Sequence, residues 1–154
     1  MFQVTRRADY ALRIMLDLGT WYENQPLPTS KVAERTGVPK AFMRKIVAEL
    51  SKTGLLQTQK GPNGGLLLER PSDEINMLEI LEAVEGPIHL NFCLIHEDNC
   101  PRHATCPGHE FWKDLQDVVI TKMTNETLAK MVARGREKTD KRNITLDTLE
   151  NSLP

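Results

Sequence analysis

Residues 32–50, VAERTGVPKAFMRKIVAEL, contain the pattern that decides the fold of this chain. Gly37 follows one short helical segment and permits the left-handed backbone that often ends a helix. Pro39 suits the first turn of a second helix, which runs to about Thr53. Two helices joined by so short a turn indicate a helix-turn-helix. The apolar stripe of the second helix is formed by Phe42, Met43, Ile46 and Leu50.

Upstream of this stretch, the sequence predicts one more helix, from a cap at Thr5 to about Gly19. Its buried stripe comprises Ala8, Ala11, Leu12, Met15 and Gly19, and its opposite face comprises Arg6, Asp9, Arg13 and Asp17. Pro26 and Pro28 interrupt the chain before Thr29 or Ser30 caps the short second helix. The N-terminal part of the chain is therefore expected to contain three helices.

Downstream, LLQTQ (55–59) and LLLE (66–69) flank the turn sequence KGPNGG (60–65), which predicts a β-hairpin. Asn76 and Glu79 have capping-box spacing, and a helix over about 77–85 follows. Three helices followed by a hairpin make a mainly α fold, the winged helix-turn-helix, with a small hairpin as the wing. Residues 1–86 form this predicted domain.

The remaining residues divide into three predicted parts. A cysteine-rich loop covers 87–108. A long amphipathic helix over about 109–124 and a short helix after it make up 109–133, and a flexible polar tail covers 134–154. The apolar stripe of the long helix is formed by Trp112, Leu115, Val119 and Met123.

Charge is distributed unevenly along the 154 residues. Residues 1–70 carry eleven Lys and Arg against six Asp and Glu, while residues 71–154 carry nine against fifteen. The basic half is thus the candidate for a polyanionic partner. No apolar run approaches the roughly 18 residues of a membrane span, so no membrane partner is expected. Three cysteines, an odd number, fit a disulfide framework poorly and indicate a reducing, cytoplasmic setting.

The exposed face of the second helix of the motif is the predicted DNA reader. The N-terminal residues of such a helix meet base edges in the major groove of double-stranded DNA, and cations there contact phosphates or guanines. Small residues let the backbone approach, and a lysine at the hairpin tip can reach a phosphate. The predicted DNA-binding residues are Lys40, Ala41, Arg44, Lys45, Lys52 and Lys60.

All three cysteines lie within CLIHEDNCPRHATCPGH (93–109), with the spacing Cys-x6-Cys-x5-Cys-x2-His. Thiolates bind soft metals, and an imidazole or carboxylate can complete the ligand set. Structural zinc accepts three cysteines and one histidine, but zinc sites usually contain a closer cysteine pair. The wide spacing favours an iron–sulfur cluster, with zinc as the alternative.

Taken together, VTRRADYALRIMLDL, KGPNGGLLL, PSDEINMLEILEAVEG and the three cysteines resemble the winged-helix iron–sulfur regulators that include IscR, NsrR and RirA. The resemblance covers about residues 1–133. It implies a homodimeric transcription regulator, such as a repressor, in which the long helix over 109–124 is the dimerisation helix. It also implies that Cys93, Cys100 and Cys106 hold a cluster of two-iron or four-iron type, whose state changes operator affinity.

The resemblance leaves two candidates for the fourth ligand. CPGHEFWKDLQ is similar to the iron–sulfur assembly regulator, which implies His109 and a two-iron cluster. RADYAL is similar to the nitric-oxide regulator, which implies Asp9 of the partner subunit and a four-iron cluster. Asp9 can instead form an ion pair with Arg13 one turn later. The resemblance therefore implies that the cluster senses nitric oxide, redox state or iron supply, and it leaves these three signals as alternatives.

Two other classes of function compete with this interpretation. One is a zinc-stabilised winged-helix DNA-binding protein without redox sensing. The other is an enzyme or electron carrier, but the sequence contains neither a Gly-rich phosphate loop nor a nucleophile–base signature. No catalytic residues and no small-molecule substrate are therefore expected.

Overall fold

The computed structural model describes residues 3–21, 25–96 and 100–150, and its side-chain description excludes His103 and residues 141–150. The elements in chain order are α1 (Arg6–Trp21), α2 (Thr29–Thr36), α3 (Lys40–Lys52), β1 (Leu56–Gln59), β2 (Gly65–Leu68), α4 (Met77–Glu85), η1 (Phe92–Leu94), η3 (His103–Thr105), α5 (Pro107–Thr124) and α6 (Leu128–Glu150). The mainly α winged helix-turn-helix is confirmed.

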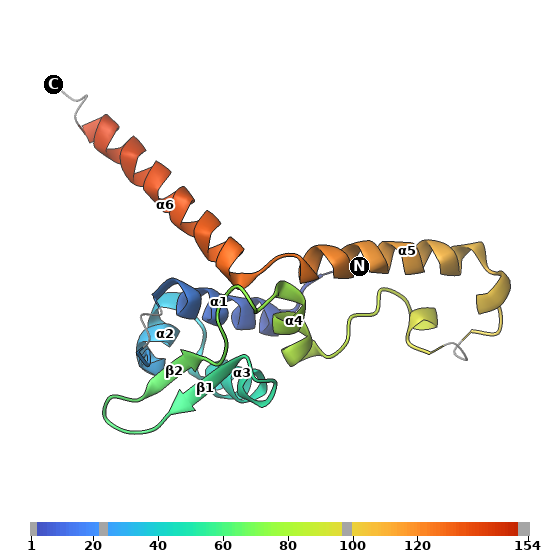
Figure 1. Ribbon diagram of the computed structural model, residues 1–154, viewed down its shortest axis with the longest axis horizontal. Helices are drawn as coiled ribbons and strands as arrows, with labels where there is room; N and C mark the ends of the chain where they lie inside the picture. The colour runs from blue at the N-terminus through green and yellow to red at the C-terminus, as the bar shows by residue number, and fades with distance from the viewer. Residues whose placement is uncertain (1–2, 22–24, 97–99, 151–154) are drawn as a thin grey trace.

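Helix α1 lies at the centre of the body and packs against α2, α3, α4 and the start of α6 (Figure 1). Its predicted stripe is correct at Ala8, Ala11 and Met15, and Ile14 and Leu18 are buried with them. The described part of the chain has one hydrophobic core, which α1–α4, both strands and the first turns of α6 share. Burial of this apolar area holds the three-helix unit together.

The turn between α2 and α3 has the expected chemistry but different boundaries. Gly37 has φ 67° and donates its N–H to the Ala33 carbonyl at 3.0 Å, so the glycine ends α2 as predicted. Helix α2, however, begins at Thr29 with Pro28 at the N-cap, and no side chain caps it. Pro39 likewise precedes α3 as its N-cap. A proline fixes φ and lacks an N–H, which suits either position.

The wing is an antiparallel hairpin in which Leu56 pairs with Leu68 and Gln59 with Gly65. Leu27, before α2, forms a bridge to Leu66 through two backbone hydrogen bonds of 2.8 and 2.9 Å. This bridge joins the wing to the segment between α1 and α2, a contact that the sequence did not predict.

The N-terminus of α4 has the predicted capping box, because Asn76 accepts from the Glu79 N–H and Glu79 accepts from the Asn76 N–H. The corner between α5 and α6 is hydrogen-bonded to the same region. Met77 donates to the Glu126 carbonyl at 2.9 Å, and Leu128 donates to the Ile75 carbonyl at 2.8 Å. The corner is thereby fixed to the body.

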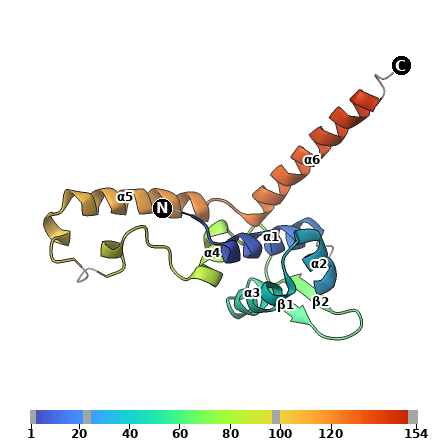
Figure 2. The ribbon, with the colours of Figure 1, turned by 180° about the vertical axis from the view of Figure 1, so that it is seen from behind.

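Helix α5 extends away from this body, and the described residues between α4 and α5, 87–96 and 100–106, lead outward to its far end (Figures 1 and 2). None of its described residues is buried. Phe111 is 60% exposed and Val118 is 66% exposed. An amphipathic helix normally buries its apolar stripe, so exposed apolar residues of this size indicate a contact with another surface. None of the described helices is long and apolar enough to cross a membrane.

Helix α6 differs from the expectation of a short helix followed by a tail. It is continuous from Leu128 to Glu150, and Arg136 reaches back to α1. Its sequence is polar but rich in good helix formers, and helical contacts such as that between Thr139 and Gly135 are local. A search for apolar periodicity misses a polar helix of this kind.

Candidate functional site

The predicted reading face lies on the exposed side of α3. Met43, Ile46, Val47 and Leu50 point into the core, so the opposite side of the helix faces solvent. Lys40, Ala41, Arg44 and Lys45 are all exposed there. The four residues thus lie in the N-terminal half of α3, and their side chains are accessible to solvent.

Two further predicted lysines lie beyond this cluster. Lys52 is exposed in the last turn of α3, and Lys60 is exposed directly after β1 in the hairpin loop. Lys52 therefore lies at the C-terminal end of α3, and Lys60 lies on the wing.

A groove of about 740 Å³ runs beside the reading face, between α2, α3 and β1. Lys40 and Arg44 line it, and so do the hydroxyl-bearing residues Thr29, Ser30 and Thr58. These three hydroxyls were not predicted as site residues, because the sequence pattern assigned Thr29 or Ser30 to a cap. Since Pro28 takes the cap position, both side chains are free to serve as surface donors near the groove.

Helix α1 contacts α3 near both ends of α3. Arg7 lies 3.6 Å from the Glu49 carboxylate, and the ring of Tyr10 meets that of Phe42. Phe42 was predicted to lie in the apolar stripe of α3, but it is 43% exposed. The prediction was wrong because Phe42 lies at the edge of the stripe, where it packs on Tyr10 instead of entering the core.

The three cysteines occupy the loop at the outer end of α5. Cys93 lies in η1, Cys100 lies between η1 and η3, and Cys106 is the N-cap residue of α5. All three are half-buried and none forms a disulfide. Three reduced thiols in one loop have the chemistry that a soft metal or an iron–sulfur cluster requires.

Cys93 and His109 line the same pocket of about 420 Å³, together with His96, Lys113 and Asp117. The structure therefore brings one predicted thiol ligand close to one of the two candidates for the fourth ligand. Among the described residues, no group of three or more Cys, His, Asp or Glu converges as a metal site. Cys100 and Cys106 are not lining residues of this pocket.

Asp9, the other candidate ligand, lies on α1. Its carboxylate Oδ2 is 2.8 Å from Arg13 Nη2, and the two side chains are 44% and 50% exposed. The Arg13 guanidinium also lies over the Tyr10 ring, 5.8 Å from the centroid. Asp9 thus has the ion pair that its spacing allowed, at an exposed position that a second molecule can approach.

Comparison with known proteins identifies the family. The model of the Rrf2 family, described as an iron-dependent transcriptional regulator, matches residues 4–134. The HTH-type transcriptional regulator IscR of Photorhabdus laumondii is 29% identical over 147 residues, which is 91% of this chain and 89% of the relative. The match includes the DNA-reading unit, the cysteine loop and α5.

Solved structures agree on the fold. CymR, the global cysteine regulator of B. subtilis, has a TM-score of 0.73 at 24% identity, over 87% of this chain and 98% of that one. IscR of T. potens has a TM-score of 0.72 at 23% identity, over 89% and 90% of the two chains. The chain belongs to the Rrf2 family and is a DNA-binding transcriptional regulator with a winged helix-turn-helix.

Proposed function

We propose that two copies of the chain pair through α5, bind operator DNA through α3 and the wing, and hold an iron–sulfur cluster at the cysteine loop. The cluster state would change operator affinity in response to nitric oxide, redox state or iron supply, in a reducing cytoplasm. The observation that carries this proposal is the position of Cys93 and His109 in one pocket at the outer end of a helix with no buried residue.

The pairing of two copies is supported by the apolar residues of α5. One side, with Leu115, Val119 and Met123, lines an apolar cavity of about 390 Å³ that opens between α5, α4 and α1. Next to this stripe, the helix exposes Phe111 and Val118, which lie two turns apart. A second α5 would remove this area from water, and the apolar contacts would stabilise the dimer.

Sedimentation velocity tests the pairing. Val118→Glu places a charge in the proposed contact, so the dimer should dissociate at micromolar concentration. Thr124→Glu is the matched control at an exposed position on a different face of the same helix, and it should remain dimeric. A dimer in both variants would place the interface elsewhere.

The cluster is supported by the donor set. Cys93, Cys100 and Cys106 would supply thiolates, and hydrogen bonds and solvent exposure would tune the reduction potential of such a cluster. His96 and Lys113 line the same pocket, where they can donate to cluster sulfur. Electron transfer or nitrosylation at the cluster is the chemistry that would report the signal.

Metal analysis separates this proposal from the zinc alternative. Protein purified without oxygen should contain iron and acid-labile sulfide and be brown, with visible absorption. The triple variant Cys93→Ser, Cys100→Ser, Cys106→Ser should be colourless but folded. Stoichiometric zinc without sulfide would support the zinc-stabilised alternative.

A further inference from the structure

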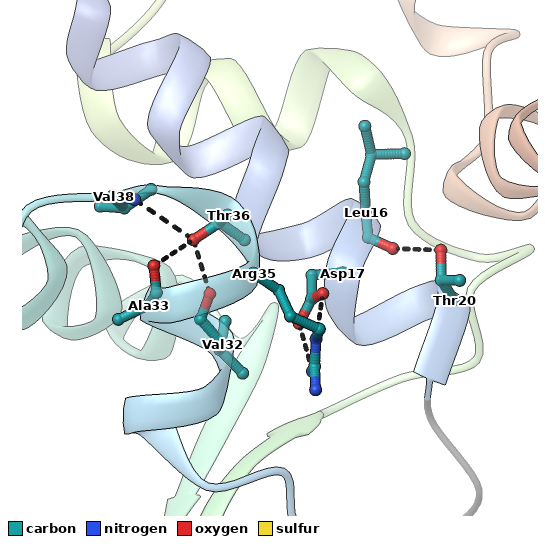
Figure 3. A network of polar contacts seen from close by, with 8 residues as sticks. All are labelled: Leu16, Asp17, Thr20, Val32, Ala33, Arg35, Thr36 and Val38. Atoms are coloured by element: carbon teal, nitrogen blue, oxygen red, sulfur yellow. Dashed lines mark hydrogen bonds and ion pairs between the residues drawn. The ribbon is translucent and has the colours of Figure 1, made fainter.

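The C-terminal end of α1, residues 17–21, contacts the first helix of the helix-turn-helix on one side. Asp17 accepts two hydrogen bonds from Arg35 of α2, from Nε to Oδ1 at 2.7 Å and from Nη2 to Oδ2 at 2.6 Å (Figure 3). The Arg35 guanidinium also lies over the Trp21 ring, 5.6 Å from its centroid. A forked pair of this kind fixes direction as well as distance.

The same end of α1 contacts the helix that follows α5. Arg136 of α6 donates from Nη2 to the Thr20 carbonyl at 2.9 Å. A Cβ atom added to Gly19 would lie 3.0 Å from Val132 Cγ2 and 3.3 Å from Leu128 Cγ. Helix α6 can therefore approach α1 this closely because residue 19 is a glycine.

The charges explain why both arginines lie here. The last turn of α1 contains no basic residue, although the C-terminal end of a helix carries partial negative charge and free carbonyls. Asp17 adds a carboxylate whose side chain is only 8% exposed. Arg35 and Arg136 supply the missing cations from α2 and α6. The hydrogen bond to Asp17 raises the pKa of Arg35, so this cation persists at every physiological pH.

A short corner connects this contact to α5. Helix α5 ends at Thr124 and α6 begins at Leu128, so the direction of one helix constrains the start of the other. The chain of contacts then runs from α5 through α6 and the end of α1 to α2. Helix α2 is joined to the reading helix α3 by the turn at Gly37.

We propose that Gly19 and Arg136 are positioning residues for operator binding, because they set the orientation of the α2–α3 unit relative to α5. In a dimer formed through α5, this orientation determines whether both reading helices meet successive major grooves together. The inference rests on the proposed dimer. Its new element is that the contact between α6 and α1 aligns the two α2–α3 units of that dimer.

The experiment uses the full chain and two DNA duplexes. The first is a duplex of about 30 base pairs with two half-sites, selected from random sequence by the parent protein. The second has one half-site replaced by unrelated sequence. Fluorescence anisotropy gives both affinities for the parent, Gly19→Ala, Arg136→Ala, Arg136→Lys and the control Lys138→Ala, which removes a charge from the same helix.

Gly19→Ala and Arg136→Ala should weaken binding to the two-site duplex at least about fivefold, the lower end of typical coupling effects. Their affinity for the one-site duplex and their sedimentation as dimers should match the parent. Arg136→Lys can still reach one carbonyl and should retain most of the affinity. Lys138→Ala should affect both duplexes alike, as a general charge effect does.

Equal losses on both duplexes in Arg136→Ala, or no loss on either, would overturn the positioning role. If Arg136→Ala does not fold, the affinities of Gly19→Ala for the two duplexes test the same role. A parent that binds both duplexes equally would refute the paired reading of two half-sites, and this inference with it. Failure of the proposed dimeric binding would therefore be seen in the parent protein, whereas failure of the positioning role would be seen only in the variants.

Discussion

The ring of Tyr10 in α1 meets the ring of Phe42 in α3 edge to face, with the two centroids 5.4 Å apart and the planes at 66°. Phe42 lies in the first turn of the reading helix, directly after Ala41 and two residues before Arg44. The contact therefore joins α1 to the part of α3 that carries the predicted DNA-binding residues, outside the main core.

Truncation of Phe42 should accordingly cost less stability than truncation of a core residue in the same helix. We expect Phe42→Ala to lower the free energy of unfolding by about 1–2 kcal/mol, because an aromatic pair and partial burial are lost. Ile46→Ala, at a fully buried position, should cost about 2–5 kcal/mol. Urea unfolding measures both, and an equal loss would show that Phe42 belongs to the core.

Much of the fold could be predicted because its signals are local. Gly37, the Asn76–Glu79 capping box and the Pro-Asn-Gly turn each depend on a few neighbouring residues, and the structure confirms the elements they delimit. Asp17 shows where local reasoning fails. It was assigned to the exposed face of α1, but Arg35 of another helix covers it.

The candidate site was only partly predictable for the same reason. A linear spacing identifies Cys93 and His109 as donors, and the structure places both at one pocket. The structure does not indicate how Cys100 and Cys106 would join them, because no group of three or more Cys, His, Asp or Glu side chains converges among the described residues. The Leu27–Leu66 bridge and the Arg136–Thr20 contact likewise join residues far apart in sequence, which no local pattern encodes.

The glycine at the start of β2 should be essential for the wing. A Cβ atom added at Gly65 would lie 2.2 Å from the Leu27 carbonyl oxygen, so Gly65→Ala must separate the wing from the segment before α2. We expect a loss of about 2–3 kcal/mol, at the upper end of ordinary substitutions. Thermal unfolding measures the loss.

Gly135→Ala is the matched control for that variant. Nothing lies within 4 Å of a Cβ added at Gly135, and the residue lies inside α6. Alanine is the better helix former by about 1 kcal/mol, so this variant should be as stable as the parent or more stable. A destabilised Gly135→Ala would indicate an unrecognised contact on α6.

Glu126 at the α5–α6 corner should make stability depend on pH in acid. Its hydrogen bond from Arg134 lowers the pKa of Glu126 below the ordinary glutamate value. A carboxylate with a lowered pKa in the folded state stabilises the fold above its unfolded pKa, about 4.3. This contribution is lost as the pH falls from there through the folded pKa.

The melting temperatures of the parent and Glu126→Gln should therefore differ by a constant amount from about pH 6 to 8. The difference should shrink as the pH is lowered past the unfolded pKa. Asp114→Asn, at an exposed position of α5, serves as the control for the loss of a surface carboxylate. A difference that persists unchanged in acid would contradict the assignment of the pH dependence to this pair.

Arg44 should contribute directly to DNA binding, since it is exposed beside the groove at the reading face. If it contacts a base, Arg44→Ala should cost about 1–3 kcal/mol and relax one operator position. A phosphate contact would instead weaken all sequences alike and reduce the salt dependence. Lys138→Ala on α6 removes an equal charge away from this face and from α5. Parent affinity in both Arg44→Ala and Lys45→Ala would exclude α3 from the interface.

In the proposed cluster, the identity of the fourth ligand would determine how the cysteine loop is connected to the DNA-binding helices. His109 is three residues beyond Cys106 and shares a pocket with Cys93, so little chain entropy is lost on closing the site. Asp9 is already paired with Arg13 at 2.8 Å, and ligation would have to displace that contact. These observations favour His109, which would leave the proposed cluster on the loop and α5.

His109→Ala should then give a labile cluster with a changed visible spectrum, while Asp9→Ala keeps the parent spectrum. His96→Ala, at an exposed residue of the same pocket, controls for the loss of an imidazole nearby. The reverse pattern, a changed spectrum in Asp9→Ala and an intact one in His109→Ala, would connect the cluster directly to α1. Loss of the cluster would then release the helix that contacts α3 through Tyr10 and Phe42.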